Sequence, residues 1–129
     1  MRSLSAGRNA FLVRILVTIS PRLYREVIAL SIHRHRPDFE VLLAPTDSLD
    51  GEAERFAPHA LVQDADEEGL PPGVPDDLVC RVQVLKTTER MDAAIELDGA
   101  TSELRDISLD ELFAALEEVE GLLQADGGG

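Results

Sequence analysis

Three polar residues stand where the chain leaves predicted apolar strands, and they are the first candidates for chemistry. Ser20, Asp64 and Thr87 each follow such a strand. Parallel α/β sheets bind ligands at the carboxyl ends of their strands, so we expect a ligand edge near these residues. The helix that begins after Ser20 would add free N–H groups and Arg22, which together suit a small anion.

Other residue types that often carry chemistry have weaker support. Cys80 is the only cysteine, which excludes an internal disulfide, and its apolar neighbours indicate a buried strand thiol. His33 and His35 point about 200° apart on a predicted helix and cannot share a metal ion there. No glycine-rich loop follows a predicted strand. We therefore predict no catalytic residue, no metal site and no cofactor.

Composition limits the class of partner. The chain has 129 residues, enough for one domain, with 44% hydrophobic and 29% charged residues. Its 12 basic and 25 acidic residues give a net charge of −13. Nucleic acids and anionic membranes are themselves negative, so neither is expected as a partner. No apolar stretch reaches the roughly 20 residues of a membrane span, and no export signal is evident, so a cytoplasmic location is expected.

The basic residues are concentrated near the start of the chain. Residues 1–45 hold seven arginines against three acids, whereas residues 46–129 hold five basic residues against 22 acids. An interaction surface is predicted on the first helix, formed by Arg22, Arg25, Arg34 and Arg36. We expect a protein partner there, either another protein or a second copy of this chain.

The first half of the chain alternates strands and helices. Strands are predicted over 11–19, 39–44 and 60–63, the last ending at Asp64. Between them, Ser20 is predicted to cap a helix whose first residue is Pro21, and Asp47 or Ser48 starts a short helix reaching Phe56. The apolar face predicted for the first helix comprises Leu23, Val27 and Leu30, widened by Tyr24, Ile28 and Ile32.

The second half contains strands with little helix. Strands are predicted over 79–85 and 93–97, and Asp98-Gly99 is a hairpin signal before a short antiparallel strand at 101–106. Ser108 and Glu111 form a capping box at the start of a closing helix. We predict a single α/β domain over 11–124, with a flexible extension at 1–10 and a Gly-rich tail at 125–129. Its sheet is expected to be mainly parallel, with about five strands flanked by helices, flavodoxin- or receiver-like, and with no helix between strands four and five.

The segment from Arg14 to Asp64 resembles the receiver domains of two-component response regulators. The strand Arg14-Ile15-Leu16-Val17 opens into a helix, a second strand follows about 25 residues on, and Pro58-His59-Ala60-Leu61-Val62-Gln63-Asp64 resembles the family's third strand. The resemblance implies that Asp64 takes the place of the phosphoacceptor. Thr87 or Thr88 would match the family's Ser or Thr after strand four.

Two parts of the receiver pattern are missing. The family's acidic pair after strand one is replaced by Thr18, Ile19 and Ser20, and strand five ends without a lysine, since the only lysine is Lys86 on strand four. Phosphoryl transfer to a carboxylate needs Mg²⁺ and its acidic ligands. We therefore expect a non-catalytic, phosphorylation-independent, receiver-like signalling or protein-interaction module in which Asp64 is vestigial. The alternative is a small-ligand or anion-binding domain that uses the carboxyl edge of the sheet.

Overall fold

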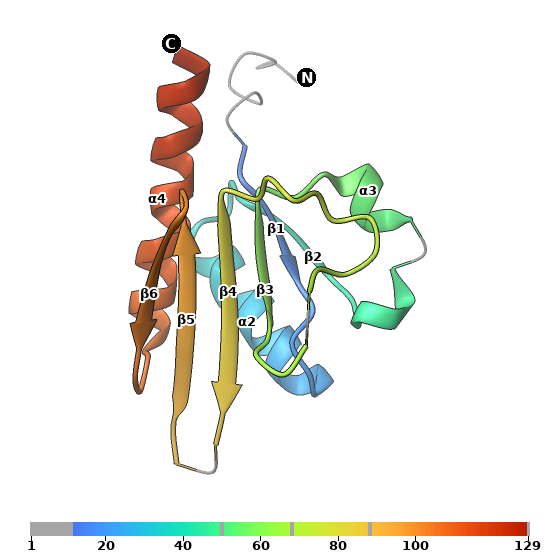
Figure 1. Cartoon of the computed structure of the whole chain (residues 1–129), viewed down its shortest axis with the longest axis vertical. Coiled ribbons are helices and arrows are strands. Elements are labelled where there is room, and N and C mark those ends of the chain that lie inside the picture. Colours follow the sequence, from blue (N-terminus) through green and yellow to red (C-terminus); the bar gives the residue numbers. More distant parts are fainter. Residues whose placement is uncertain (1–11, 50, 68, 88, 129) are drawn as a thin grey trace.

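The computed structural model describes residues 12–49, 51–67, 69–87 and 89–128 and contains one six-stranded sheet (Figure 1). The strands are β1 Arg14–Val17, β2 Glu40–Leu43, β3 Ala60–Asp64, β4 Cys80–Lys86, β5 Met91–Leu97 and β6 Ala100–Leu104. The helices are α2 Arg22–His35, the short 3-10 helix η1 Thr46–Ser48, α3 Glu52–Phe56 and α4 Leu109–Gly128. The predicted extension at 1–10 lies outside the described residues.

The prediction of a mainly parallel sheet of about five strands is wrong. The strand order is β2-β1-β3-β4-β5-β6, in which the first four strands are parallel, while β5 is antiparallel to β4 and β6 is antiparallel to β5. Only residues 87–90 separate β4 from β5, whereas a parallel neighbour needs a crossover of about a dozen residues or more. The short connection therefore turns the chain back on itself.

The sixth strand follows from the predicted hairpin turn. Asp98 and Gly99 both have positive φ, 52° and 86°, and they form a two-residue loop between the paired residues Leu97 and Ala100. Positive φ at both central positions is what a tight hairpin of this length requires. The Asp-Gly signal is thus confirmed, and the sheet is mixed.

Two cores lie on opposite faces of the sheet. Helices α2 and α4 pack on one face, where Ile28 and Leu116 belong to the same apolar cluster as Ile15. The other face carries a smaller cluster around Leu16 and Leu61, which Leu49, Ala53 of α3 and Val74 cover. The part of this second face on β4 to β6 has no helix over it among the described residues (Figure 1). A partly polar antiparallel sheet can leave one face to water.

Helix α2 buries only part of the predicted apolar face. Leu23, Val27 and Leu30 are 65%, 46% and 50% exposed, whereas Ile28 and Ile32 are buried. The exposed row and the buried row are both apolar at helical spacing, so the periodicity of the sequence alone does not show which of the two meets the core. The helix lies over β1 and β2 at one side of the sheet, so only one side of it meets the core. Leu23, Val27 and Leu30 are left pointing outward.

Candidate functional site

The carboxylate of Asp64 lies at the carboxyl end of β3 and is held from two neighbouring strand ends. Its Oδ2 accepts hydrogen bonds from the backbone N–H of Ser20 at 2.9 Å and from the Ser20 hydroxyl at 2.6 Å. Its Oδ1 forms an ion pair with the ammonium group of Lys86, the last residue of β4. The side chains of Asp64 and Lys86 are only 9% and 18% exposed, so the pair is largely shielded from water.

The strand register explains why these residues meet. β1 and β3 are parallel neighbours, with Val17 opposite Val62, so the segments that follow them leave the sheet at the same edge. In the β3–β4 pair, Asp64 lies opposite Val84. Lys86 is two residues beyond Val84 and therefore on the same face of the sheet as Asp64. Its long side chain reaches back to the carboxylate.

Lys86 is absent from the predicted site because the receiver resemblance places a lysine after the fifth strand. The signal that points to it is its position at the end of the strand that follows Asp64 in the sequence. Consecutive parallel strands are usually neighbours and end at the same edge of the sheet. A lysine there is within reach of an aspartate that ends the preceding strand.

The electrostatics of the site favour an ionised Asp64. Burial alone would raise the pKa of this carboxyl group, but the hydrogen bonds from Lys86 and Ser20 outweigh burial and hold the pKa below its usual range. The Lys86 ammonium also lies 5.7 Å from the ring centre of Tyr24, within the range of a cation–π contact. Asp64 is thus a charged, fully engaged structural group at neutral pH.

The prediction that Ser20 caps the first helix is wrong. The helix begins at Arg22, its N-terminal capping residue is Pro21, and no side chain makes the capping hydrogen bond. Ser20 instead donates both its N–H and its hydroxyl to Asp64. The donors expected to bind an anion at this strand end therefore bind the protein's own Asp64 carboxylate.

The other two residues of the predicted ligand edge bond to their own neighbours. Arg22 pairs with Glu26 at 2.6 Å on the helix surface. The Thr87 hydroxyl donates to the carbonyl of Arg90 at 3.0 Å and accepts the N–H of Arg90 at 3.0 Å, which fixes the β4–β5 turn. Within the described part of the chain, Ser20 is the one residue of the predicted edge that bonds to Asp64.

This geometry gives phosphoryl transfer little support. A carboxylate that attacks a phosphoryl group needs Mg²⁺, and Mg²⁺ binds through carboxylate and other oxygen ligands. Residues 18–20 supply no acid. In the residues that the structure describes, no group of three or more His, Cys, Asp or Glu could hold a metal ion. Asp64 would also have to leave Lys86 and Ser20 before it could react.

Two further residues that could act as a nucleophile or a base are engaged within the fold. Cys80 is buried, as predicted, and burial raises the pKa of its thiol to about 12. The Nδ1 atom of His59 accepts the backbone N–H of Arg14 at 3.0 Å. Burial, and to a lesser extent the charge of Arg14, lowers the pKa of His59, so its ring is neutral at neutral pH. Both residues are structural.

The predicted arginine surface is divided between the interior and the exterior of the domain. Arg25 is buried and donates to the carbonyl of Ile19 at 3.1 Å. Arg36 pairs with Glu120 of α4 at 2.7 Å and lies over the ring of Phe39, which joins the end of α2 to α4. The remaining two arginines, Arg22 and Arg34, are exposed.

An apolar surface occupies part of α2 and the neighbouring strand β2. Its residues on the helix are Leu23, Val27 and Leu30, three and four positions apart and about half exposed. Leu30 also lines a groove of about 410 Å³ between α2 and β2, together with Val41 and Leu43 of the strand. Glu26, Ala29 and His33 complete the lining of this groove. We call the row Leu23, Val27 and Leu30, taken together with Val41 and Leu43, the α2–β2 surface.

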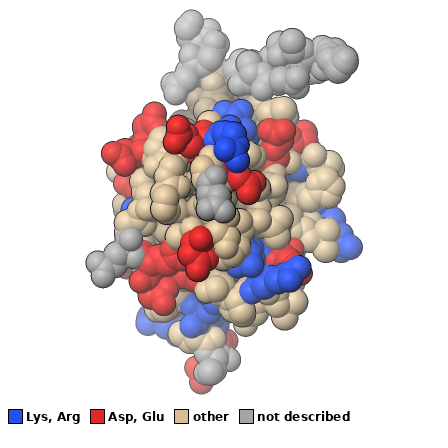
Figure 2. All heavy atoms as spheres, turned by 90° about the vertical axis from the view of Figure 1, so that its right-hand side faces the viewer, with Lys and Arg blue, Asp and Glu red and all other residues tan. Residues whose placement is uncertain are grey.

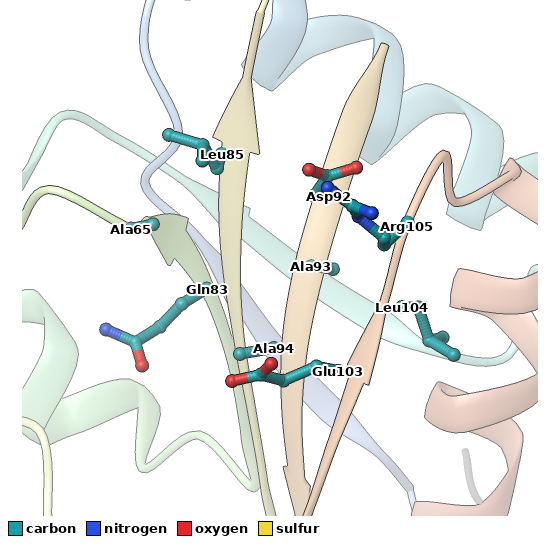
Figure 3. Close-up of a pocket in the computed structure, with 9 residues that line it drawn as sticks. All are labelled: Ala65, Gln83, Leu85, Asp92, Ala93, Ala94, Glu103, Leu104 and Arg105. Atoms are coloured by element: carbon teal, nitrogen blue, oxygen red, sulfur yellow. The ribbon is translucent and has the colours of Figure 1, made fainter.

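Another hollow lies elsewhere on the sheet. It has a volume of about 440 Å³ and sits on the face of β4, β5 and β6 that no described helix covers. Its residues are spread along these three strands and Ala65 rather than converging on a point (Figure 3). Asp92 is already bonded to Arg90 at 2.9 Å and to the N–H of Asp106 at 2.8 Å. The hollow is a shallow, solvated sheet surface.

Comparison of the chain with protein-family models, with curated proteins and with solved structures finds no match in any of the three. No helix among the described residues has the length and apolar character needed to cross a membrane. The Asp64 site and the α2–β2 surface are therefore the two features of the chain from which a function can be inferred.

Proposed function

We propose that this α/β domain is a non-catalytic, phosphorylation-independent signalling module that works by contact with another protein chain. The observation that carries the proposal is the exposed apolar row of Leu23, Val27 and Leu30 on α2. A contiguous apolar surface is disfavoured in water and commonly marks a protein-binding site. The receiver-like features of residues 14–64 support a signalling role.

The state of Asp64 supports the phosphorylation-independent part of the proposal. Its two carboxylate oxygens are engaged by Ser20 and Lys86, so the negative charge already has an internal cation. A domain with a neutralised carboxylate at this position does not need a phosphoryl group to fix its conformation. Asp64 then acts as a permanent structural contact at the edge of the sheet.

The alternative function, binding of a small ligand or an anion at the carboxyl edge of the sheet, has weaker support. The two donors of Ser20 that would hold an anion are bonded to Asp64. Arg22, the expected counter-charge, is paired with Glu26. A cytoplasmic location, expected from the sequence, stays a prediction.

Replacing Leu23, Val27 and Leu30 together by glutamine is expected to leave the fold intact. Substitutions at exposed positions usually change the free energy of unfolding by about 0.5 kcal/mol or less, so we expect a total change of about 1 kcal/mol. Urea unfolding followed by circular dichroism, at a concentration where both proteins are monomers, measures this change.

The matched control replaces Ile28 and Ile32 of the same helix by glutamine. These side chains are 2% and 1% exposed, so each substitution is expected to cost about 2–5 kcal/mol. If the surface variant lost as much stability as the core variant, its three residues would belong to the core. The proposed role of the surface in protein contact would then be wrong.

A further inference from the structure

We infer that the α2–β2 surface binds a second copy of this chain, with the free edges of two β2 strands pairing antiparallel and two α2 helices packing side by side. The inference rests on the proposed function, because it names the occupant of the surface proposed there. It follows from the direction of backbone groups on β2, from the position of α2 and from the local charge.

The edge of β2 is able to pair with a copy of itself. Among the described residues, β2 pairs with β1 on one side only. On the side that faces β1, the N–H of Glu40 donates to the carbonyl of Val13 at 2.8 Å, and the N–H of Ala44 donates to the carbonyl of Val17 at 3.2 Å. Backbone groups alternate in direction along a strand, so the N–H and C=O groups of Val41 and Leu43 point away from β1.

A two-fold axis through Leu42 would use these outward groups on both chains. It would place Val41 of one chain opposite Leu43 of the other, and Leu43 opposite Val41, so that each pair exchanges its N–H and C=O groups. Such an arrangement is isologous and closed, as in most homodimers. The two sheets would become one continuous sheet across the interface.

The same axis would bring the two α2 helices next to each other. An axis perpendicular to the sheet keeps both α2 helices on one face, next to each other, because α2 lies beside β2. The side of α2 next to β2, which carries Leu30 together with Glu26 and His33, would then face the other chain, and the groove at Leu30 would be covered. Each apolar side chain removed from water stabilises the pair by roughly 25 cal/mol per Å² buried.

Charge also favours this surface as the point of contact between two copies. Each chain carries a net charge of −13, so two copies repel each other over most of their surface. Of the charged residues over 22–43, Arg25 is buried, Arg22 pairs with Glu26, and Arg36 pairs with Asp38 and with Glu120 of α4, which leaves Arg34 and Glu40. Seen from the β2 side, basic side chains lie among acidic ones with uncharged areas between them (Figure 2). The local charge is thus close to zero, so two copies repel each other less here than over the acidic remainder of the chain.

Sedimentation equilibrium of the full chain, from micromolar to millimolar concentration, tests the inference. We expect a reversible dimer that tightens as salt is added, because salt screens the repulsion between the acidic remainders of the two chains. Leu30→Glu should weaken the dimer by about tenfold or more, because it buries a charge in the interface without a partner. Its circular dichroism spectrum should not change.

The matched control is Leu85→Glu, which makes the same change at a leucine of similar exposure, 52% against 50%, on a different face of the sheet. It should dimerise like the wild type. A wild type that stays monomeric at every concentration and salt level would overturn the inference, as would equal dimerisation by the Leu30→Glu variant. Neither result bears on the stability test of the proposed function, which fails only if the glutamine variant loses the stability of a core variant.

Amide hydrogen exchange separates strand pairing from a contact made by the helices alone. In the paired dimer, exchange of the Val41 and Leu43 amides should slow as protein concentration rises, because they become hydrogen-bonded across the interface. If these two amides exchanged at the same rate in monomer and dimer, the strand pairing would be wrong.

Discussion

Leu16→Asp is expected to unfold the domain. Leu16 lies in the middle of β1, is fully buried and belongs to the core between the sheet and α3. Loss of a buried leucine side chain alone costs about 2–5 kcal/mol. A buried carboxylate without a partner adds several kcal/mol more, and the sum is comparable to the whole stability of a small domain, about 5–15 kcal/mol. Circular dichroism and thermal unfolding of the purified variant measure the effect.

Leu85→Asp is the control for this substitution. It introduces the same carboxylate at a leucine that is 52% exposed, where water can solvate the charge. This variant is expected to unfold cooperatively, close to the wild type. A soluble Leu16→Asp protein with an unchanged spectrum and unfolding transition would contradict the position of β1 in the sheet.

Lys86→Met is expected to destabilise the domain by about 2–4 kcal/mol at neutral pH. Removing one partner of a buried ion pair leaves the other charge uncompensated, which typically costs about 3–5 kcal/mol. We place the loss lower because Lys86 is 18% exposed and Ser20 still donates to Asp64. Urea unfolding of the variant and the wild type measures the difference in the free energy of unfolding.

The loss should depend on pH in a defined direction. In the wild type the pKa of Asp64 is lowered, so its contribution to stability is present above the usual carboxyl pKa of about 4 and disappears as pH falls through the lowered value. In the Lys86→Met variant the hydrogen bond and the charge of Lys86 no longer lower this pKa, so that contribution to stability is smaller. The difference between the two proteins should therefore shrink as pH falls from about 4 through the lowered pKa of Asp64.

The double variant Lys86→Met with Asp64→Asn controls for loss of packing. It removes both charges. Its loss in the free energy of unfolding should be smaller than the sum of the losses of the two single variants, by about 1–3 kcal/mol. Strictly additive losses, or a Lys86→Met loss that does not change with pH, would show that the ion pair does not hold the site together.

The first half of the fold follows closely from the sequence, and the second half less so. Apolar runs rich in β-branched residues, separated by a helical pattern, predict β1, β2 and β3 in a parallel arrangement. The direction of β5 depends on whether a crossover helix precedes it. The shortness of the segment after Lys86 is visible in the sequence, and it implies an antiparallel hairpin.

Only the part of the candidate site that is placed by the ends of strands could be predicted from the sequence. Ser20 and Asp64 both follow strands of one parallel sheet, so their proximity could be expected. The contact with Lys86 depends on the register between β3 and β4, which a single sequence does not specify. The exposed face of α2 depends on which of two apolar rows meets the core, and that choice is made by tertiary packing.

The most direct test of the central claim, that the domain works by contact without phosphorylation of Asp64, is an amide NMR spectrum. It is recorded with and without Mg²⁺ and beryllofluoride, which mimics a phosphoryl group on an aspartate. We predict that the signals of Asp64, Ser20 and Lys86 stay unchanged, because the carboxylate is already bonded to Ser20 and Lys86. Shifts clustered at these residues and at Thr87 would mean that the site binds the phosphoryl mimic and switches, and would contradict the claim.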